Sequence, residues 1–195
     1  GNSAFGTRSL FLNTTGSELV AVGYEALRSN TTAGSNVAVG YQALYSNTTG
    51  PSNVAVGYAT AFSNTTGDAL TAVGHRALYS NTTGTNNSAY GYYALNNSTT
   101  GNNNTAIGLS ALASNTTASS NTAVGSTAFY STTTGTANVG MGFRAGYSVA
   151  TGSYNVAIGS QALQSNTTTS GHTAIGYQAG YSANAGTIAI TAIGY

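Results

Sequence analysis

The sequence predicts an all-β chain: a parallel β-solenoid (β-roll) of twelve turns with a period of 17, which occupies residues 1–195 as a single domain. Three observations predict this fold. A short repeat of constant length runs through the chain, one segment of each repeat follows a strand pattern, and the remainder is rich in turn-forming residues.

The repeat is marked by a glycine that closes a tetrapeptide of the type x-Ala-Val/Ile-Gly. Eleven such glycines, from Gly6 to Gly176, follow one another in steps of 17, and the twelfth, Gly194, comes after 18. The last step predicts one inserted residue within 186–191. A unit of this length is too short for helical-hairpin repeats, which run to about 33 residues or more, and a leucine-rich repeat needs several spaced leucines.

The tetrapeptide is expected to be the strand of each turn, because residues 36–41 (Asn-Val-Ala-Val-Gly-Tyr) alternate with period two and carry β-branched side chains. The alanines are expected to stack on one face of the strand and the Val and Ile residues on the other. Tyrosines continue the bulkier face: Tyr24, Tyr41, Tyr58, Tyr92, Tyr177 and Tyr195. Leucines form a second apolar ladder: Leu10, Leu27, Leu44, Leu78, Leu95, Leu112 and Leu163.

The Asn-Thr-Thr-Gly segments, such as 47–50 and 81–84, are expected to be turns in which glycine takes a positive φ. Their Thr, Asn, Ser and Gly residues disfavour a helix. With one repeat per turn, stacked at the inter-strand spacing of about 4.8 Å, the chain would form a rod on the order of 55 Å long.

Both faces of the expected strand are apolar. Parallel strands of this kind are usually buried on both faces, and one narrow coil covers only the inner face. We therefore expect the outer face to meet other copies of the chain, as in a homotrimer; an end-to-end filament is the assembly that uncapped ends would allow. The alternative is a wide monomeric coil whose Val and Tyr ladder is half exposed. Neither end of the sequence resembles a polar cap, so we expect the domain to be a segment of a longer fibre, or copies to stack end to end.

Composition excludes several kinds of partner. A net charge of +1 with four scattered arginines gives no basic surface for nucleic acid. The absence of cysteine excludes disulfides and thiolate sites. No apolar run approaches the roughly 20 residues of a membrane span. The glycine-rich segment 140–146 lacks the GxGxxG spacing of a phosphate loop, so we interpret it as a degenerate turn.

Titratable residues are too few and too scattered to predict a catalytic or metal site. Glu18 and Glu25 lie in neighbouring turns but in different phases of the repeat, and Asp68 is the third carboxylate. His75 replaces a ladder tyrosine and His172 replaces the Asn that begins a strand, which indicates variation of the repeat rather than metal ligation. We expect no catalytic residue, no metal and no cofactor.

Asn-Thr-Thr sequons recur at one phase of the repeat, which we expect to be exposed, so that attached glycans would form a ladder along one side of the rod. The alternative is that Asn-Thr-Thr-Gly is simply a favourable turn. The candidate N-glycosylation sites are Asn13, Asn30, Asn47, Asn64, Asn81, Asn115 and Asn166.

The strand motif resembles the "NSVAIG" element in the head domains of trimeric autotransporter adhesins. It occurs here in residues 53–57 (NVAVG), 104–108 (NTAIG), 121–125 (NTAVG) and 155–159 (NVAIG). The fuller unit is similar to repeats of tail-fibre-type proteins of phages and marine bacteria. The resemblance implies a trimer of left-handed parallel β-rolls on a cell surface or virion, although the repeat of this chain is longer than that of the adhesin heads.

Together these observations favour an extracellular structural segment without catalytic activity, in a fibre, a surface filament, a phage tail fibre or an adhesin. One alternative is a glycan-decorated, self-assembling filament subunit. Another is a carbohydrate- or ice-binding module that presents two files of threonine. The files are Thr14, Thr31, Thr48, Thr65, Thr82, Thr99 and Thr116, and Thr15, Thr32, Thr49, Thr66, Thr83, Thr100 and Thr117.

Overall fold

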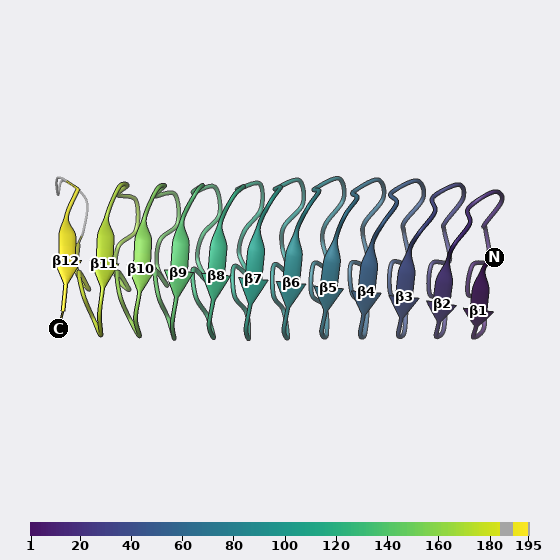
Figure 1. The fold of residues 1–195 in the computed structure, drawn as a ribbon, viewed down its shortest axis with the longest axis horizontal. Helices are drawn as coiled ribbons and strands as arrows, with labels where there is room; N and C mark the ends of the chain where they lie inside the picture. Colours follow the sequence, from purple (N-terminus) through teal and green to yellow (C-terminus); the bar gives the residue numbers. More distant parts are fainter. Residues whose placement is uncertain (184–188, 195) are drawn as a thin grey trace.

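The computed structural model describes residues 1–183 and 189–194 and confirms the predicted parallel β-solenoid. Its strands form one parallel sheet in chain order, and each strand belongs to one turn of the coil (Figure 1). The strands are Ser3–Phe5 (β1), Val20–Val22 (β2), Val37–Val39 (β3), Val54–Val56 (β4), Thr71–Val73 (β5), Ser88–Tyr90 (β6), Thr105–Ile107 (β7), Thr122–Val124 (β8), Val139–Met141 (β9), Val156–Ile158 (β10), Thr173–Ile175 (β11) and Thr191–Ile193 (β12).

The register of the sheet follows the repeat. Ala38 of β3 pairs with Ala55 of β4, one period later, and the same step joins the strands up to β11. Between β11 and β12 the step is 18, because Thr173 pairs with Thr191. The predicted insertion within 186–191 falls partly outside the described residues, as does Tyr195 of the predicted tyrosine ladder.

Each strand has an inner and an outer face, as the alternation predicts. In β3 the central Ala38 is fully buried, whereas Val37 and Val39 on either side of it are only partly covered. The alanine ladder packs against the leucine ladder, of which Leu27, Leu44 and the members from Leu78 onward are fully buried; Leu10, near the N-terminus, is partly buried. These two ladders form the apolar core of the rod.

A glycine corner ends every strand. Gly40 has a φ of 136°, a backbone conformation that residues with a side chain rarely adopt. A Cβ atom at Gly40 would also lie 2.2 Å from the carbonyl oxygen of Gly57 in the next turn. The glycine thus lets the chain turn and lets neighbouring turns approach closely, which accounts for its recurrence in every repeat.

The turn after the corner, residues 41–46, contains left-handed residues that are not glycine. Gln42 and Leu44 have φ values of 53° and 51°. Such a conformation costs roughly 1–2 kcal/mol for a residue with a side chain. Full burial of a leucine contributes about 1.5–3 kcal/mol. The Leu44 amide also donates to Thr60 O (3.0 Å) in the next turn. Packing against the adjacent turn therefore holds Leu44 in this conformation.

The Asn-Thr-Thr-Gly segments bend the chain, but the prediction of positive φ at their glycines is wrong: neither Gly50 nor Gly84 has one. Glycine is needed there for space instead. A Cβ atom at Gly50 would lie 2.2 Å from Gly67 O, and one at Gly84 would lie 2.4 Å from Gly101 O. The close stacking of turns, and not the local turn type, selects these glycines.

The segment 140–146 departs from the repeat because of a bulky neighbour. Phe129 fills the leucine position of its turn and is fully buried. The next turn has Gly140 in place of the strand alanine and Gly146 in place of the leucine. Cβ atoms at these two positions would lie 2.6 Å and 2.2 Å from the Phe129 ring. The two glycines therefore make room for the ring.

Candidate functional site

The seven candidate glycosylation sites line the inside of the coil. Asn13 is partly covered and the six others are fully buried. In a central turn, Asn47 Nδ2 donates to Asn30 Oδ1 (3.1 Å) and to Gly50 O (2.9 Å). The bonded run extends from Asn13 to Asn81, and we call the seven residues the first Asn ladder.

The expectation that this phase of the repeat is exposed is therefore wrong. Nδ2, the atom that would carry a sugar, is enclosed in the fold and already donates two hydrogen bonds in the central turns. A glycan there would force the side chain out and would leave buried carbonyl groups unpaired, which costs about 1–3 kcal/mol for each group. The structure thus favours the alternative interpretation, in which Asn-Thr-Thr-Gly is a bend held by its asparagine.

A second Asn ladder runs along the residue that precedes most strands; Leu19 and Leu70 take this place before β2 and β5. Asn53 N donates to Asn36 Oδ1 (2.8 Å), and Asn53 Nδ2 donates to Gly50 O (3.1 Å) and Gly67 O (2.9 Å). These side chains are fully buried, and the backbone they satisfy belongs to adjacent turns. The members of the second Asn ladder are Asn36, Asn53, Asn87, Asn104, Asn121, Asn138 and Asn155.

His172 continues the second Asn ladder, as its place in the repeat predicts. Its backbone amide donates to Asn155 Oδ1 (3.0 Å), and its Nδ1 accepts from Ile190 N (3.0 Å). Since Nδ1 accepts, the proton of the neutral ring is on Nε2, which lies 2.6 Å from Thr169 Oγ1. Burial lowers the pKa of the His172 imidazole. The ring acts as a neutral substitute for an asparagine amide.

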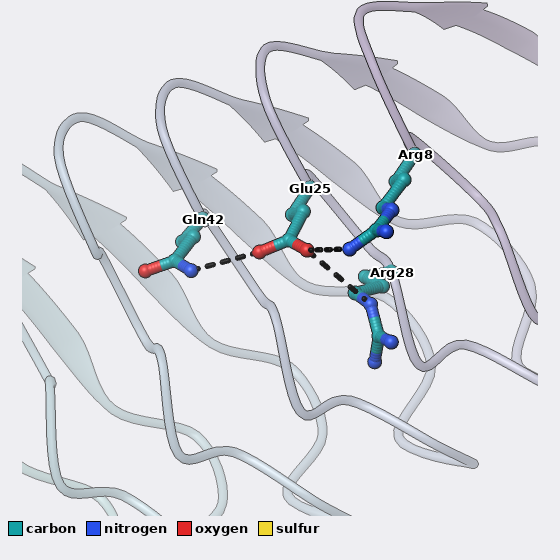
Figure 2. Close-up of polar contacts among 4 residues, drawn as sticks. All are labelled: Arg8, Glu25, Arg28 and Gln42. Carbon is teal, nitrogen blue, oxygen red and sulfur yellow. Dashed lines mark hydrogen bonds and ion pairs between the residues drawn. The ribbon is translucent and has the colours of Figure 1, made fainter.

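The largest group of charged side chains surrounds Glu25. Figure 2 shows Gln42 Nε2 donating to one carboxylate oxygen (2.9 Å), while Arg8 and Arg28 approach the other at 3.4 and 3.5 Å. The hydrogen bond from Gln42 holds the pKa of the Glu25 carboxyl below its usual value; burial opposes this, and the two guanidinium groups add to the lowering. Glu25 is thus occupied by donors on both oxygens.

The other titratable residues do not join this group. Glu18 accepts a hydrogen bond from Ser35 Oγ (2.8 Å) and does not pair with Glu25. Among the described residues, no three His, Cys, Asp or Glu side chains lie close enough together to hold a metal ion. The part of the chain that the structure describes also contains no helix long and apolar enough to cross a membrane.

Two columns of stacked rings run along the outside of the rod. The tyrosine column follows the corner glycine and consists of Tyr24, Tyr41, Tyr58, His75 and Tyr92, with ring centroids 4.9–5.3 Å apart. His75 takes a tyrosine place in it, as predicted. Burial raises the pKa of the Tyr41 phenol, and the neighbouring phenols of Tyr58 and Tyr24 add to the effect. The rings stay about half exposed, so the column is a surface feature.

The second aromatic column lies four positions later in each turn. Tyr45, Phe62 and Tyr79 stack at 4.9 and 5.3 Å, and farther along Tyr130 stacks on Tyr147 at 5.3 Å. Arg28 occupies one rung, with its guanidinium 5.4 Å from the Tyr45 ring, a cation–π contact. This column was not among the ladders predicted from the sequence, although its residues recur with the period of the repeat.

The two threonine files differ in exposure. In the first file, each hydroxyl donates to a carbonyl of the next turn, as Thr48 Oγ1 does to Thr65 O (3.0 Å). The second file, for example Thr49 and Thr66, faces solvent. A flat surface made of both files is therefore not present, because the first file bonds within the rod.

The exterior thus presents two aromatic columns, one threonine file and the outer strand face, while the polar ladders are internal. Comparisons of the chain with protein-family models, with curated proteins and with solved structures find no match, so its surface has to be interpreted from its own chemistry.

Proposed function

We propose that the chain is a structural segment of an extracellular fibre or surface filament, of the kind found in phage tail fibres and adhesins, and that it has no catalytic activity. The observation that supports this is the uniform stack of one short strand per turn, which builds a long rod from a single sheet (Figure 1). In such a solenoid each repeat contacts its neighbours, so adding repeats increases length without forming a closed site.

The outer strand face supports assembly with other copies. We call the first and third residues of β2 to β11 the outer strip. Among them, Val22 is 37% exposed, Ile107 41% and Met141 51%. The outer strip contains no charged side chain: its third residues are Val, Ile, Met or Tyr, and its first residues are Val in five strands and Thr or Ser in the other five. The tyrosine column stands two residues after the third position of the strand. Contiguous exposed apolar surface of this kind marks interaction sites in soluble proteins.

The occupant that fits the outer strip best is another copy of the same chain. The side chains of the outer strip repeat once per turn, at the spacing between neighbouring strands. A second solenoid of the same chain carries side chains at that same spacing along its whole length. The resemblance to the trimeric heads of autotransporter adhesins points in the same direction. We propose a homotrimer in which the outer strips and tyrosine columns face one another.

Native mass spectrometry and light scattering of the purified chain test this proposal. We expect a species of three chains, and Val39→Lys combined with Val56→Lys should dissociate it, because both side chains point outward from the sheet. The control variant is Thr66→Lys, which adds the same charge at an exposed bend and should leave the assembly intact. A wild-type chain that stays monomeric at all accessible concentrations would contradict the assembly.

A further inference from the structure

The second aromatic column has a gap of two rungs. Rings stand on both sides of it, but Asn96 and Ala113 take the two places between Tyr79 and Tyr130. A surface pocket of about 260 Å³ lies at this gap, between the turns that follow β6 and β8. We call it the notch.

One wall of the notch is the face of an aromatic ring. Tyr130 packs one face on Tyr147, at 5.3 Å and with an interplanar angle of 8°. Its other face is directed toward the preceding turn, where Ala113 has only a methyl group in place of a ring. Elsewhere in this column, ring centroids of neighbouring turns lie 4.9–5.3 Å apart. A ligand ring placed over Ala113 could therefore stack on Tyr130, as Phe62 stacks on Tyr79.

The rest of the notch is uncharged and mostly polar. Tyr93 contributes a second aromatic side chain, and the other side chains besides Ala113 are Ser and Asn. Ser110, Ser114 and Asn97 contribute hydroxyl and amide groups that both donate and accept hydrogen bonds. Asn96 Nδ2 is held by Arg76 O (3.0 Å), which leaves its Oδ1 as an acceptor beside the notch. Among the described residues, no charged side chain lines the notch, so a phosphate or carboxylate ligand would find no counter-charge there.

We propose that the notch binds a neutral pyranose sugar, with the apolar face of the ring stacked on Tyr130 and its hydroxyls bonded to the surrounding Ser and Asn side chains. A pyranose combines one apolar face with a rim of hydroxyls, which matches an aromatic wall beside polar neutral groups. The volume lies just below the range of about 300–1,000 Å³ found for sites of drug-sized ligands. The ligand is therefore one or two sugar rings of a longer glycan. This inference does not depend on the assembly proposed above.

Saturation-transfer NMR of the intact chain with lactose, maltose, cellobiose and N,N′-diacetylchitobiose, each at millimolar concentration, tests the site. At least one of these sugars should receive saturation from the protein. Tyr130→Ala removes the stacking wall and should weaken binding by about tenfold or more. Ala113→Tyr fills the gap with the residue type that the column carries in other turns, so it should abolish binding while preserving the fold.

Tyr45→Ala is the matched control, because it deletes a ring from the same column away from the notch and should leave binding unchanged. The proposal is overturned if none of the four sugars binds to the wild-type chain. It is also overturned if Ala113→Tyr binds as well as the wild type, because the sugar would then lie elsewhere, for example on the exposed threonine file.

Discussion

At the residue scale, several polar side chains are buried although polar residues are usually exposed to solvent. His172 is fully buried between Asn155 and Ile190, and its Nδ1 is an acceptor for a backbone amide. Its place in the repeat was predictable, because it stands where other turns carry Asn. Its burial was not predicted above, although strand alternation places residue 172 on the same inner face as Ala174, two residues later.

The buried imidazole makes stability depend on pH. The pKa of His172 is lowered in the folded chain, so the unfolded chain binds a proton first as pH falls below the ordinary value of about 6.5. Stability should therefore be constant at higher pH and should fall as pH decreases through this value. Protonation of Nδ1 would also remove the acceptor used by Ile190 N. Urea denaturation at pH 7.5 and 5.5 measures the effect.

Two variants separate this effect from other titrations. His172→Asn restores the ladder residue and should make the urea midpoints at the two pH values nearly equal. His75→Tyr, which replaces the partly buried histidine of the tyrosine column, should retain the wild-type pH dependence. If His172→Asn remained as acid-sensitive as the wild type, the buried imidazole would not be the responsible group.

At the scale of the structural element, the ladders bind each turn to the next. A buried asparagine amide is costly alone, but the stack satisfies it: Asn47 Nδ2 donates to Asn30 Oδ1 and Gly50 O, and Asn47 Oδ1 accepts from Asn64 Nδ2. The first Asn ladder is interrupted at Ser98. Within the described chain, Asn81 Oδ1 and Ser98 Oγ have no hydrogen-bond partner. The interruption shows how much the ladder depends on an uninterrupted run of amides.

Ser98→Asn should repair the first Asn ladder and raise the unfolding free energy by about 1 kcal/mol, a typical net value for one buried hydrogen bond. The new Nδ2 can donate to Asn81 Oδ1, as Asn81 Nδ2 does to Asn64 Oδ1 (2.8 Å). Chemical denaturation compares Ser98→Asn with Ser98→Ala. The alanine variant leaves Asn81 Oδ1 unpaired, so its unfolding free energy should be lower than that of Ser98→Asn. Equal stability of the two variants would mean that the amide ladder contributes nothing at this turn.

At the scale of the whole molecule, the rod is a one-dimensional stack in which each turn contacts the turns beside it. Its stability should be close to a sum of the contributions of single turns and of the interfaces between them. All contacts between the described strands join consecutive strands, from β1·β2 to β11·β12, so no turn depends on a distant one. A change in the length of one repeat would therefore shift the residues of that turn out of register with the turns beside it.

Deletion of residues 36–52 removes one complete turn and should leave a folded solenoid, because Ser35 then joins Asn53 with every ladder in register. We expect a β-rich circular dichroism spectrum and a modestly lower denaturation midpoint. Deletion of residues 36–44 removes about half a turn and should be more damaging, although fewer residues are lost, because alanine would no longer stack on alanine. If the shorter deletion were the better tolerated, register would not govern the stack.

The sequence by itself determined the period, and with it which residues lie above one another: Ala38 over Ala55, Leu27 over Leu44, and rings over rings. These follow from counting, because a parallel stack with one repeat per turn brings equivalent positions together. The tertiary structure decided which way the loop side chains point. Left-handed residues such as Leu44 rotate the chain between strands, and they are stable only when an adjacent turn supplies hydrogen bonds and packing. For that reason the asparagines expected on the surface line the interior, where neighbouring turns satisfy their amides.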